Sequence, residues 1–537
     1  MGKIRRLVGG AGTGKTTALL QMLEERGGDP FNVGFISFSR AARREASSRA
    51  EAAWNIEQGL LESIGWFRTV HSLAYRCLKV ANGELLTWAK ADVDWLSEAF
   101  GVRVSVEGES QVFGGDPRAA AAMTAWRTAR STMSPLSEVV QRMQRLSLDV
   151  PSFESLLPYV NKYESAKRID GRLDFEDLLM KFAGIKHEAD GHPDWWLPSC
   201  DTPEGVDFWI IDEAQDNSRL LDACCSRLAR ASDTETTVIA GDPFQSVMSF
   251  NGADWRAMMA WEVDEEVIMR KSWRCPDEFL RLGECCLRPT EGYFDRKIDG
   301  AGHSGVIRGY DDIPADIEAD SDTMIVSRTR FRENEVAEEL KLRGIPYRKL
   351  GSAAGSASRK AIAFEGLYKF ERDEPVREDE LMEVIAALPS VARGEKVLRR
   401  GAKTEWKNGK FAGKFDLAFQ SDLVDIGATD LLVNAIKTGQ WTGLIDGAPA
   451  WRRSVDKYGV ELTQNPKVRI GTVHSSKGLE AENVIVYCPT SGFVHKCSQL
   501  DKATLDEEHR IAYVAVTRAK SSLRVVRSGP YNMEVPV

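Results

Sequence analysis

The strongest constraint on the fold is a glycine-rich segment near the start of the chain, Gly9-Gly10-Ala11-Gly12-Thr13-Gly14-Lys15-Thr16. Apolar residues at positions 4, 7 and 8 precede it as a short strand, and residues 17–23 follow it with the pattern of a helix. A strand, a GxxxxGK[ST] segment and a helix in this order are typical of a loop that binds the phosphates of a nucleotide. This part of the chain is therefore predicted to form a nucleotide-binding α/β sheet.

The chemistry of this loop follows from its residue types. Glycines let the backbone curl around a polyphosphate, and the N–H groups at the start of the helix point towards its oxygens. Lys15 is expected to reach the β- and γ-phosphates, and the Thr16 hydroxyl is expected to help hold Mg²⁺. The predicted nucleotide-binding residues of the loop are Gly9, Ala11, Gly12, Thr13, Gly14, Lys15, Thr16 and Thr17.

A second segment, in the middle of the chain, supplies matching carboxylates. Residues 208–211 are apolar and predict a strand, after which come Asp212 and Glu213. Asp212 is expected to bind Mg²⁺, and Glu213 is expected to activate the attacking water. A chance match in an ordinary loop is the alternative for the glycine-rich segment, and the flanking elements and paired carboxylates disfavour it. Together the two segments predict hydrolysis of a nucleoside triphosphate, with ATP and Mg²⁺ as cofactors.

Composition describes a globular protein of several domains. The 537 residues are too many for one ordinary core and predict three or four domains. Charged residues at 28% and hydrophobic residues at 43% exclude a disordered chain. No apolar run approaches the ~18–20 residues that cross a bilayer, and the N-terminus lacks the pattern of a signal peptide, so a cytoplasmic location is expected. The nine cysteines lack paired CxxC spacing and are predicted to be reduced thiols.

Short apolar runs that end in small or polar residues fall into two blocks. The first comprises residues 4–8, 33–38, 208–211 and 237–240, and the second comprises 324–326, 468–471, 484–487 and 523–526. Such runs are typical of strands in a buried parallel sheet, so we predict an α/β protein with two sheets, each interrupted by a largely helical insertion. The expected boundaries are 1–78 and 168–265 for the first sheet domain, 79–167 for its insertion, 266–349 and 462–537 for the second sheet domain, and 350–461 for the second insertion.

A loop suited to sensing the terminal phosphate follows the strand at 237–240. Gly241 and Asp242 come directly after this strand, and Gln245 follows shortly. Taken alone, Gly-Asp-Pro is often only a turn. Its position after the acidic strand favours the phosphate-sensing interpretation.

Aromatic and basic residues occur together at two further places. Trp273 lies beside Arg274, which pairs a ring that can stack on a base with a charge that can neutralise phosphate. Residues 507–519 predict a helix that carries Arg510 and Arg518. An arginine delivered to the terminal phosphate would make hydrolysis depend on domain closure, whereas ordinary solvation is the simpler interpretation of either arginine alone.

These segments, in this order, resemble the motifs of superfamily-1 DNA helicases of the UvrD/Rep/PcrA type across nearly the whole chain. Residues 37–45 resemble the family's TFTNKAAREM segment, 67–73 its TxHS element, 173–179 its DFDDLL segment, 212–216 its DExQD motif and 241–253 its GDDDQSIYxWRGA motif. Residues 328–329 with 344–347 resemble RTN…GIPY, 471–480 resemble TxHSAKGLE, and 507–519 resemble EERRLxYVxxTRA. The resemblance implies two RecA-like parallel-sheet P-loop domains, each with a largely helical insertion, and ATP-driven 3′ to 5′ movement on single-stranded DNA with unwinding of the duplex.

The resemblance also implies roles for individual residues. The catalytic set would be Lys15, Asp212, Glu213, Gln245, Arg274 and Arg518, with Gln245 and the two arginines at the γ-phosphate. Trp273 would stack on adenine, and Glu480 would reach the ribose. The nucleic-acid track would include Ser39, Arg40, Thr69, His71, His474 and Ser476. The partners would be single-stranded DNA, junctions of single- and double-stranded DNA, and accessory proteins of replication or repair.

Phe250 offers an aromatic face to an unpaired base, worth ~1–3 kcal/mol by truncation, although core packing would equally explain a phenylalanine there. The family's Tyr, Trp and Arg in this motif are replaced by Met248, Phe250 and Asn251, so weaker stacking is expected. The first eight residues lack the glutamine segment that reads adenine in the family, so the sequence leaves open whether ATP is strictly preferred.

The second insertion carries a cluster of basic residues. Its members are Arg393, Lys396, Arg399, Arg400, Lys403, Lys407, Lys410 and Lys414, interleaved with Trp406, Phe411 and Phe415. Basic residues with aromatics suit a duplex junction, with Arg399, Arg400 and Lys403 as candidate contacts, and a solvated charged face explains the pattern equally well. The net charge of −9 does not itself point to DNA.

Two other functions are compatible with the motifs. A translocase could remodel protein–DNA complexes without separating strands, and the altered third motif and short insertion favour this alternative. An RNA-directed motor is the third interpretation, which the DExQD and TxHSAKGLE-like motifs disfavour.

Overall fold

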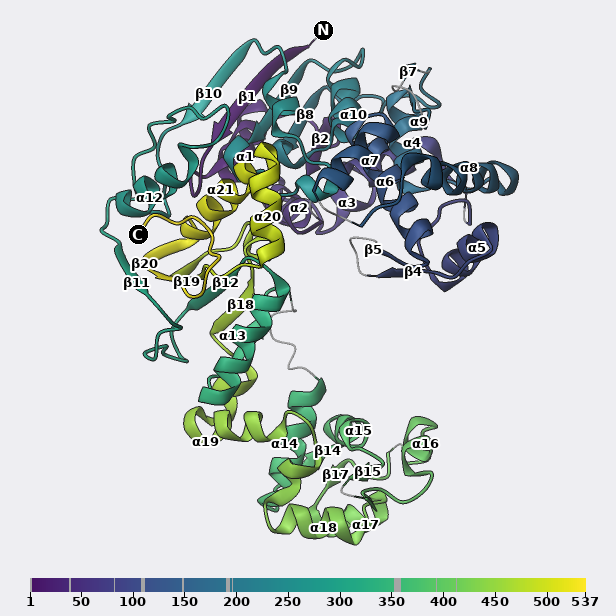
Figure 1. Cartoon of the computed structure of the whole chain (residues 1–537). Coiled ribbons are helices and arrows are strands. Elements are labelled where there is room, and N and C mark those ends of the chain that lie inside the picture. The colour runs from purple at the N-terminus through teal and green to yellow at the C-terminus, as the bar shows by residue number, and fades with distance from the viewer. Residues whose placement is uncertain are drawn as a thin grey trace. The chain divides into compact units, whose positions relative to one another are not determined.

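A computed structural model of the chain describes residues 2–537 apart from 38–39, 82, 108–111, 147–148, 190–193, 196, 352–358, 393 and 412, and at 40–42 and 194–195 it describes the backbone only. The chain forms two compact units (Figure 1). The first comprises Met1–Val306, Ser491–Thr517 and Met533–Val537, and the second comprises Ile307–Thr490 and Arg518–Asn532. Within the described part of the chain, no helix is both long and apolar enough to cross a membrane.

The first unit is built on a six-stranded sheet with the order β10-β1-β9-β8-β2-β3. Its strands are β1 (Lys3–Gly9), β2 (Val33–Ser37), β3 (Trp66–Arg68), β8 (Phe208–Asp212), β9 (Thr236–Gly241) and β10 (Glu265–Met269). Neighbouring strands pair in parallel. Because parallel strands end at the same edge, Gly9, Asp212 and Gly241 come together there.

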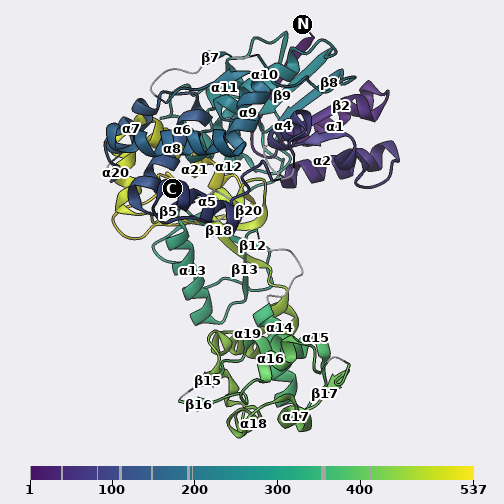
Figure 2. The same ribbon diagram turned by 90° about the vertical axis from the view of Figure 1, so that its right-hand side faces the viewer.

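Two hydrophobic layers cover this sheet, one on each face. Ile210 of β8 packs with α1 (Lys15–Arg26) and α2 (Arg40–Trp54), whereas the next residue, Ile211, packs with α9 (Phe175–Ala183) and α10 (Arg219–Ala229). This alternation is the period of two that a strand imposes on its side chains. Figure 2 shows α1 and α2 on one side of the sheet and α9 and α10 on the other.

The first insertion has a hydrophobic core of its own, which includes Trp126 and Leu156. Its elements are α5 (Lys90–Phe100), β4 (Val104–Glu107), β5 (Val112–Gly115), α6 (Pro117–Thr132), α7 (Leu136–Arg145) and α8 (Phe153–Asp170). The helices agree with the helical insertion that the sequence predicts. The antiparallel strand pair β4–β5 was not predicted. The other elements of the unit are α3 (Leu60–Ser63), α4 (Val70–Leu78), β6 (Ile185–Lys186), β7 (Asp194–Trp195), α11 (Trp255–Met259), α12 (Asp277–Leu287), α20 (Gly492–Leu500) and α21 (Lys502–Val516).

The second unit contains the other six-stranded sheet, with the order β11-β20-β19-β12-β18-β13. Its strands are β11 (Val306–Tyr310), β12 (Thr323–Ser327), β13 (Tyr347–Lys349), β18 (Val468–Thr472), β19 (Ala481–Tyr487) and β20 (Ala519–Val526), and the pairings from β20 to β13 are parallel. Helix α13 (Arg330–Arg343) packs on it through Val336 and Leu340. The predicted fold, two parallel α/β sheets, is confirmed.

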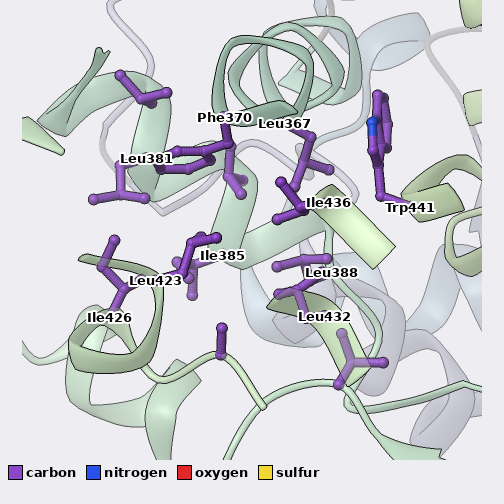
Figure 3. Packing of buried hydrophobic residues seen from close by; sticks show 14 of the residues in the cluster. Leu367, Phe370, Leu381, Ile385, Leu388, Leu423, Ile426, Leu432, Ile436 and Trp441 are labelled. Carbon is purple, nitrogen blue, oxygen red and sulfur yellow. The ribbon is translucent and has the colours of Figure 1, made fainter. Parts of the chain in front are cut away.

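The second insertion is mainly helical and packs around a separate hydrophobic core. Figure 3 shows part of this core, which includes Leu367, Leu381 and Ile436. The helices are α14 (Arg359–Glu371), α15 (Glu378–Ala387), α16 (Ala402–Lys407), α17 (Leu423–Ile426), α18 (Asp430–Lys437) and α19 (Ala448–Gln464). Two short antiparallel pairs accompany them: β14 (Val376–Arg377) with β17 (Leu417–Ala418), and β15 (Val391–Ala392) with β16 (Glu395–Lys396).

The division of the chain differs from the boundaries expected from the sequence. Residues 266–306 and 491–517 belong to the first unit, not with the second sheet. Hydrogen bonds explain this: the Ser272 hydroxyl donates to the carbonyl of Ala11 at 2.9 Å, and the Trp273 N–H donates to the carbonyl of Gly12 at 2.8 Å. The segment after β10 is therefore tied to the glycine-rich loop.

A buried ionic cluster joins the first insertion to α9. Arg130, only 2% exposed, contacts Asp174 at 2.6 Å and Asp177 at 3.2 Å, and Lys167 contacts the same two carboxylates at 3.1 and 2.7 Å. Burial alone would raise the pKa of Asp174, but Arg130 and Lys167 hold it well below its usual value. The cations already balance these carboxylates, so the cluster holds α6, α8 and α9 together.

Replacing Arg130 by glutamine is expected to lower the free energy of unfolding of the first unit by about 3–5 kcal/mol, because it removes one of the two cations that balance these buried carboxylates. Tryptophan fluorescence during urea unfolding measures the change, and Trp126, whose ring lies 5.1 Å from the guanidinium carbon of Arg130, contributes to the signal. Arg118→Gln, at an exposed position on the same helix, is the control. Equal unfolding curves for the two variants would contradict the structural role of the cluster.

Candidate active site

The glycine-rich segment forms a tight loop between β1 and α1. Gly12 and Gly14 have φ values of +69° and +80°, which favour glycine, and a Cβ on Gly12 would lie 2.4 Å from the Cβ of Arg274. The Lys15 amino group donates to the carbonyl of Gly9 at 2.9 Å. Helix α1 begins at Lys15, so its first N–H groups and its positive dipole end face the loop, an arrangement that suits a polyphosphate.

Two carboxylates stand on the adjacent strand end, as the sequence predicts. Asp212 is 3% exposed, and its Oδ1 accepts the N–H of Glu213 at 2.9 Å. Glu213 has φ +55°, a conformation that costs a non-glycine residue roughly 1–3 kcal/mol and is typical of functional sites. Asp212 ends β8 and Thr16 lies in the first turn of α1, and a carboxylate with a hydroxyl would supply the oxygen ligands that Mg²⁺ prefers.

Gln215 connects these carboxylates to the sensing loop. Its Nε2 donates to Oε2 of Glu213 at 2.5 Å, and its Oε1 accepts the N–H of Asp242 at 3.0 Å. Its carbonyl also accepts the hydroxyl of Ser246 at 2.8 Å. The fully buried Gln215 therefore fixes the orientation of Glu213 relative to the loop that carries Gln245.

Asp242 is the centre of the buried network. Its Oδ1 accepts from Arg296 at 2.6 Å, and its Oδ2 accepts from Gln245 at 2.8 Å and from the hydroxyl of Tyr513 at 3.3 Å. Burial would lower the pKa of Arg296, but the neighbouring Asp242 carboxylate raises it, so the guanidinium stays charged. Gln245 is thereby held at the carboxyl edge of the sheet and linked to Glu213 through Asp242 and Gln215.

Arg296 and Tyr513 were not among the predicted site residues. Arg296 is fully buried, and its second arm donates to Glu284 at 2.8 Å. Its sequence surroundings resemble no phosphate or metal motif, so no sequence signal identifies it. Tyr513 lies inside the predicted 507–519 helix, where only the arginines were singled out.

Trp273 and Arg274 lie against the glycine-rich loop. The ring of Trp273 is 74% exposed and passes close to Gly14, whose Cβ position would lie 3.7 Å from Cδ1 of the ring. An exposed aromatic face at this place is available for stacking. The backbone of Arg274 approaches Gly12, so both residues accompany Lys15, Asp212, Glu213 and Gln245 in the first unit.

The other predicted nucleotide residues belong to the second unit. Arg518 is 1% exposed, and its Nη1 donates to the carbonyl of Leu479 at 3.3 Å, next to Glu480. Glu480 forms an ion pair with Lys520 at 2.6 Å. Arg510, in the first unit, is instead buried, and its Nε donates to the carbonyl of Ser246 at 2.8 Å. The two arginines of the 507–519 segment thus have different surroundings.

Known protein families match both sheets. Residues 2–265 match the UvrD/REP helicase N-terminal domain, and residues 455–528 match the UvrD-like helicase C-terminal domain. The chain belongs to the UvrD/Rep family of superfamily-1 helicases. The family predicted from the motifs is confirmed.

Two relatives illustrate how far this similarity extends. F-box DNA helicase 1 of Gallus gallus is 23% identical over 378 residues, which cover 68% of this chain and 32% of that protein. The ATP-dependent DNA helicase Rep of Escherichia coli (strain K12) is 42% identical over 71 residues, which cover 13% of this chain and 10% of Rep. The chain thus spans about a third of the first relative and a tenth of the second.

Several residues that are predicted to contact single-stranded DNA lie in the first unit of this UvrD/Rep family member. Ser39 lies outside the described residues, and Arg40 begins α2 with only its backbone described. The hydroxyl of Thr69 caps α4 by accepting the N–H of Ser72 at 3.3 Å. Phe250 is 60% exposed in a short 3₁₀ turn (Ser249–Asn251), so it is not a core residue. An exposed ring at the end of the sensing loop leaves the stacking hypothesis open.

In the second unit, His474 and Ser476, which are predicted to contact single-stranded DNA, lie in one 3₁₀ turn (His474–Ser476). Ser476 is fully buried, and its hydroxyl donates to the carbonyl of Val473 at 2.7 Å. The hydroxyl therefore stabilises the turn that carries His474.

The basic cluster of the second insertion differs from the sequence expectation in one respect. Trp406, Phe411 and Phe415 do not form an exposed wedge, because they are 3%, 6% and 8% exposed and stack in the core, with the first two ring centroids 4.8 Å apart. Arg399 forms an ion pair with Glu405, and Lys403 donates to the carbonyl of Ala386 at 3.1 Å. Arg399 and Arg400 are exposed, and Arg393 lies outside the described residues. The charges thus remain at the surface while the aromatics are structural.

His71 is partly buried at the start of α4, and its ring meets that of Phe175 edge-on at 5.7 Å. Loss of hydration, reinforced by the positive charge of Arg127, lowers the pKa of His71 to about 4. His71 is therefore neutral near pH 7, and any contact with a nucleic-acid strand is through hydrogen bonds, not charge.

The lowered pKa of His71 predicts a pH-dependent stability. Between about pH 6.5 and 4 the unfolded chain binds a proton that the folded protein excludes, so the free energy of unfolding falls as the pH falls through this window. In His71→Gln this contribution disappears, so its thermal midpoint should approach or exceed that of the wild type as the pH falls from 7 to 4.5. His303→Gln, at an exposed position, is the control. Parallel pH profiles for wild type and His71→Gln would contradict the assignment.

Proposed function

We propose that the chain is an ATP-dependent motor that moves on single-stranded DNA and unwinds duplex DNA, with 3′ to 5′ polarity from the family resemblance. The observation that carries the proposal is the continuous hydrogen-bonded path from Glu213 through Gln215 and Asp242 to Gln245. Such a path lets the presence of a terminal phosphate at Gln245 affect the group that activates water.

The residues of the site have separate roles in hydrolysis. The loop amides and Lys15 bind the phosphates, and Thr16 with Asp212 would hold Mg²⁺, which neutralises the charge that develops on the phosphate oxygens. Glu213, oriented by Gln215, accepts the proton of the attacking water. Arg274 and Arg518 would complete the site at the γ-phosphate, while Trp273 and Glu480 hold the base and ribose.

We assign contact with single-stranded DNA to loops and helix starts in each of the two units. Phe250 offers a stacking platform, while Arg40, Thr69, His71, His474 and Ser476 mark the path along the strand. Arg40 is the first residue of α2, where backbone phosphates would be met, and the resemblance assigns Ser39 to the same track. This part of the proposal rests on the family resemblance together with the exposure of Phe250.

A translocase that remodels protein–DNA complexes without separating strands is the second candidate. The burial of Trp406, Phe411 and Phe415 favours it, because these rings are not available to wedge into a duplex junction. The two functions share the nucleotide site and differ in what the second insertion does.

One experiment separates these functions. Unwinding is measured on 3′-tailed, 5′-tailed and blunt duplexes, and ATP hydrolysis is measured with matched single-stranded DNA and RNA. Unwinding of only the 3′-tailed duplex with DNA-stimulated hydrolysis supports the helicase. Stimulated hydrolysis without unwinding supports the translocase, and stimulation by RNA alone overturns both.

The nucleotide-site assignment predicts the behaviour of two variants. Lys15→Ala and Glu213→Gln should each lower DNA-stimulated hydrolysis by about 10²-fold or more, because one lacks the cation that binds the phosphates and the other lacks the base. Glu213→Gln should still bind ATP, measured with a fluorescent analogue. Glu24→Gln, at an exposed position on α1, is the control. Turnover near the wild-type rate in either site variant would exclude the assigned role.

The basic cluster predicts a change in the salt dependence of duplex binding. Neutralising Arg399, Arg400 and Lys403 together should lower duplex affinity and flatten the plot of log K against log salt by about 0.9 for each phosphate that the variant no longer neutralises. Lys437→Gln, at an exposed position in the same insertion, is the control. If the slope does not change, the cluster is a solvated surface and does not bind the duplex.

A further inference from the structure

One face of helix α21 follows the whole length of the sensing loop. Glu507, Arg510 and Tyr513 are three residues apart, so they project from the same side of the helix. Glu507 accepts the N–H of Ser249 at 2.9 Å and also its hydroxyl, and Arg510 donates to the carbonyl of Ser246 at 2.8 Å. The helix thus contacts the loop from Asp242 to the turn that contains Phe250.

The last of these three residues also reaches the glycine-rich loop. The Tyr513 hydroxyl accepts the N–H of Ala11 at 3.2 Å and donates to Oδ2 of Asp242 at 3.3 Å. The residue is fully buried, and burial raises the pKa of its phenol, so the hydroxyl remains protonated and can serve as donor and acceptor at once. A single hydroxyl therefore joins an amide of the phosphate-binding loop to the carboxylate that holds Gln245.

We propose that this face of α21 couples the nucleotide site to the turn that carries Phe250, the predicted stacking platform for a DNA base. Tyr513 is the positioning residue at the nucleotide end of the helix face, and Glu507 is the positioning residue at the Phe250 end. The inference rests on the proposed function, and it adds a path between the two sites that lies within the first unit. Its physical basis is that backbone amides of the loop attract phosphate oxygens, so a bound nucleotide changes the setting of the Ala11 amide and of the hydroxyl that accepts from it.

Rigid attachment transmits such a change. Tyr513, Arg510 and Glu507 lie on one continuous helix, which moves as a unit because its backbone is hydrogen-bonded throughout. A shift at Ala11 therefore reaches Ser249, whose neighbour Phe250 is the exposed ring. Nucleotide and DNA would then each favour the same arrangement of the helix, which is the condition for coupling between two sites.

The test measures this coupling directly. The dissociation constant of a fluorescent single-stranded oligo(dT) is determined for the full chain with and without a non-hydrolysable ATP analogue, and that of the analogue is determined with and without oligo(dT). The two ratios must agree, because coupling is reciprocal. If a residue only stabilises the fold, its replacement changes the dissociation constant of a ligand by the same factor with and without the second ligand. The ratio of the two constants then stays at the wild-type value.

Tyr513→Phe removes the hydroxyl and keeps the ring, and it is expected to reduce the coupling ratio about fivefold, the factor associated with one buried hydrogen bond. Tyr293→Phe is the matched control, since its hydroxyl donates to Glu284 at 2.9 Å in the same buried network and reaches neither loop. Tyr293→Phe should keep the wild-type ratio.

Glu507→Gln tests the other end of the face and keeps the inference falsifiable if Tyr513→Phe does not fold. It should also lower the ratio, with little change in the affinity for the analogue alone. Wild-type ratios in the folded variants would overturn the inference and leave the proposed function intact. Absence of coupling and of DNA-stimulated hydrolysis in the wild type would overturn the proposed function itself.

Discussion

The buried ion pair between Asp242 and Arg296 organises the first unit. Both side chains are fully buried and lie 2.6 Å apart, and such a pair is favourable only when other hydrogen bonds satisfy the remaining groups. Here the Asp242 carboxylate also binds Gln245, Tyr513 and the N–H of Phe244, and Arg296 also binds Glu284. The pair therefore holds together the sensing loop, the segment after β10 and helix α21.

This arrangement explains why the first unit includes chain segments far apart in the sequence. The parallel sheet brings the ends of β1, β8 and β9 to one edge, and the buried pair adds residues 296 and 513 to that edge. The glycine-rich loop is thus enclosed by Trp273 and Tyr513, which are not part of the sheet. The setting of the glycine-rich loop therefore depends on contacts that form only when helix α21 packs against it.

The sequence was sufficient for the parts of the fold that local patterns determine. The eight predicted strands are present because each is a buried apolar run, and the loop with Lys15 and the strand end with Asp212 follow from residue type and spacing. The four edge strands, β3, β10, β11 and β13, were missed because they are short or half exposed and lack a continuous apolar run. Arg296 was missed because only tertiary packing gives a buried arginine its partner.

Several polar residues of the helicase motifs have a structural role in this chain. Residues 173–179 resemble a helicase motif, yet Asp174 and Asp177 cap α9 and bind Arg130 and Lys167 inside the protein. In the same way Thr69 caps α4 and Ser476 stabilises its own turn. The side-chain oxygens of Asp174 and Thr69 are needed by the backbone whether or not a DNA strand is bound, because a helix start leaves N–H groups that require acceptors. The exposed rings of Phe250 and Trp273 carry no oxygen that could cap a helix and are not buried in the core, so neither capping nor core packing explains their presence in these motifs.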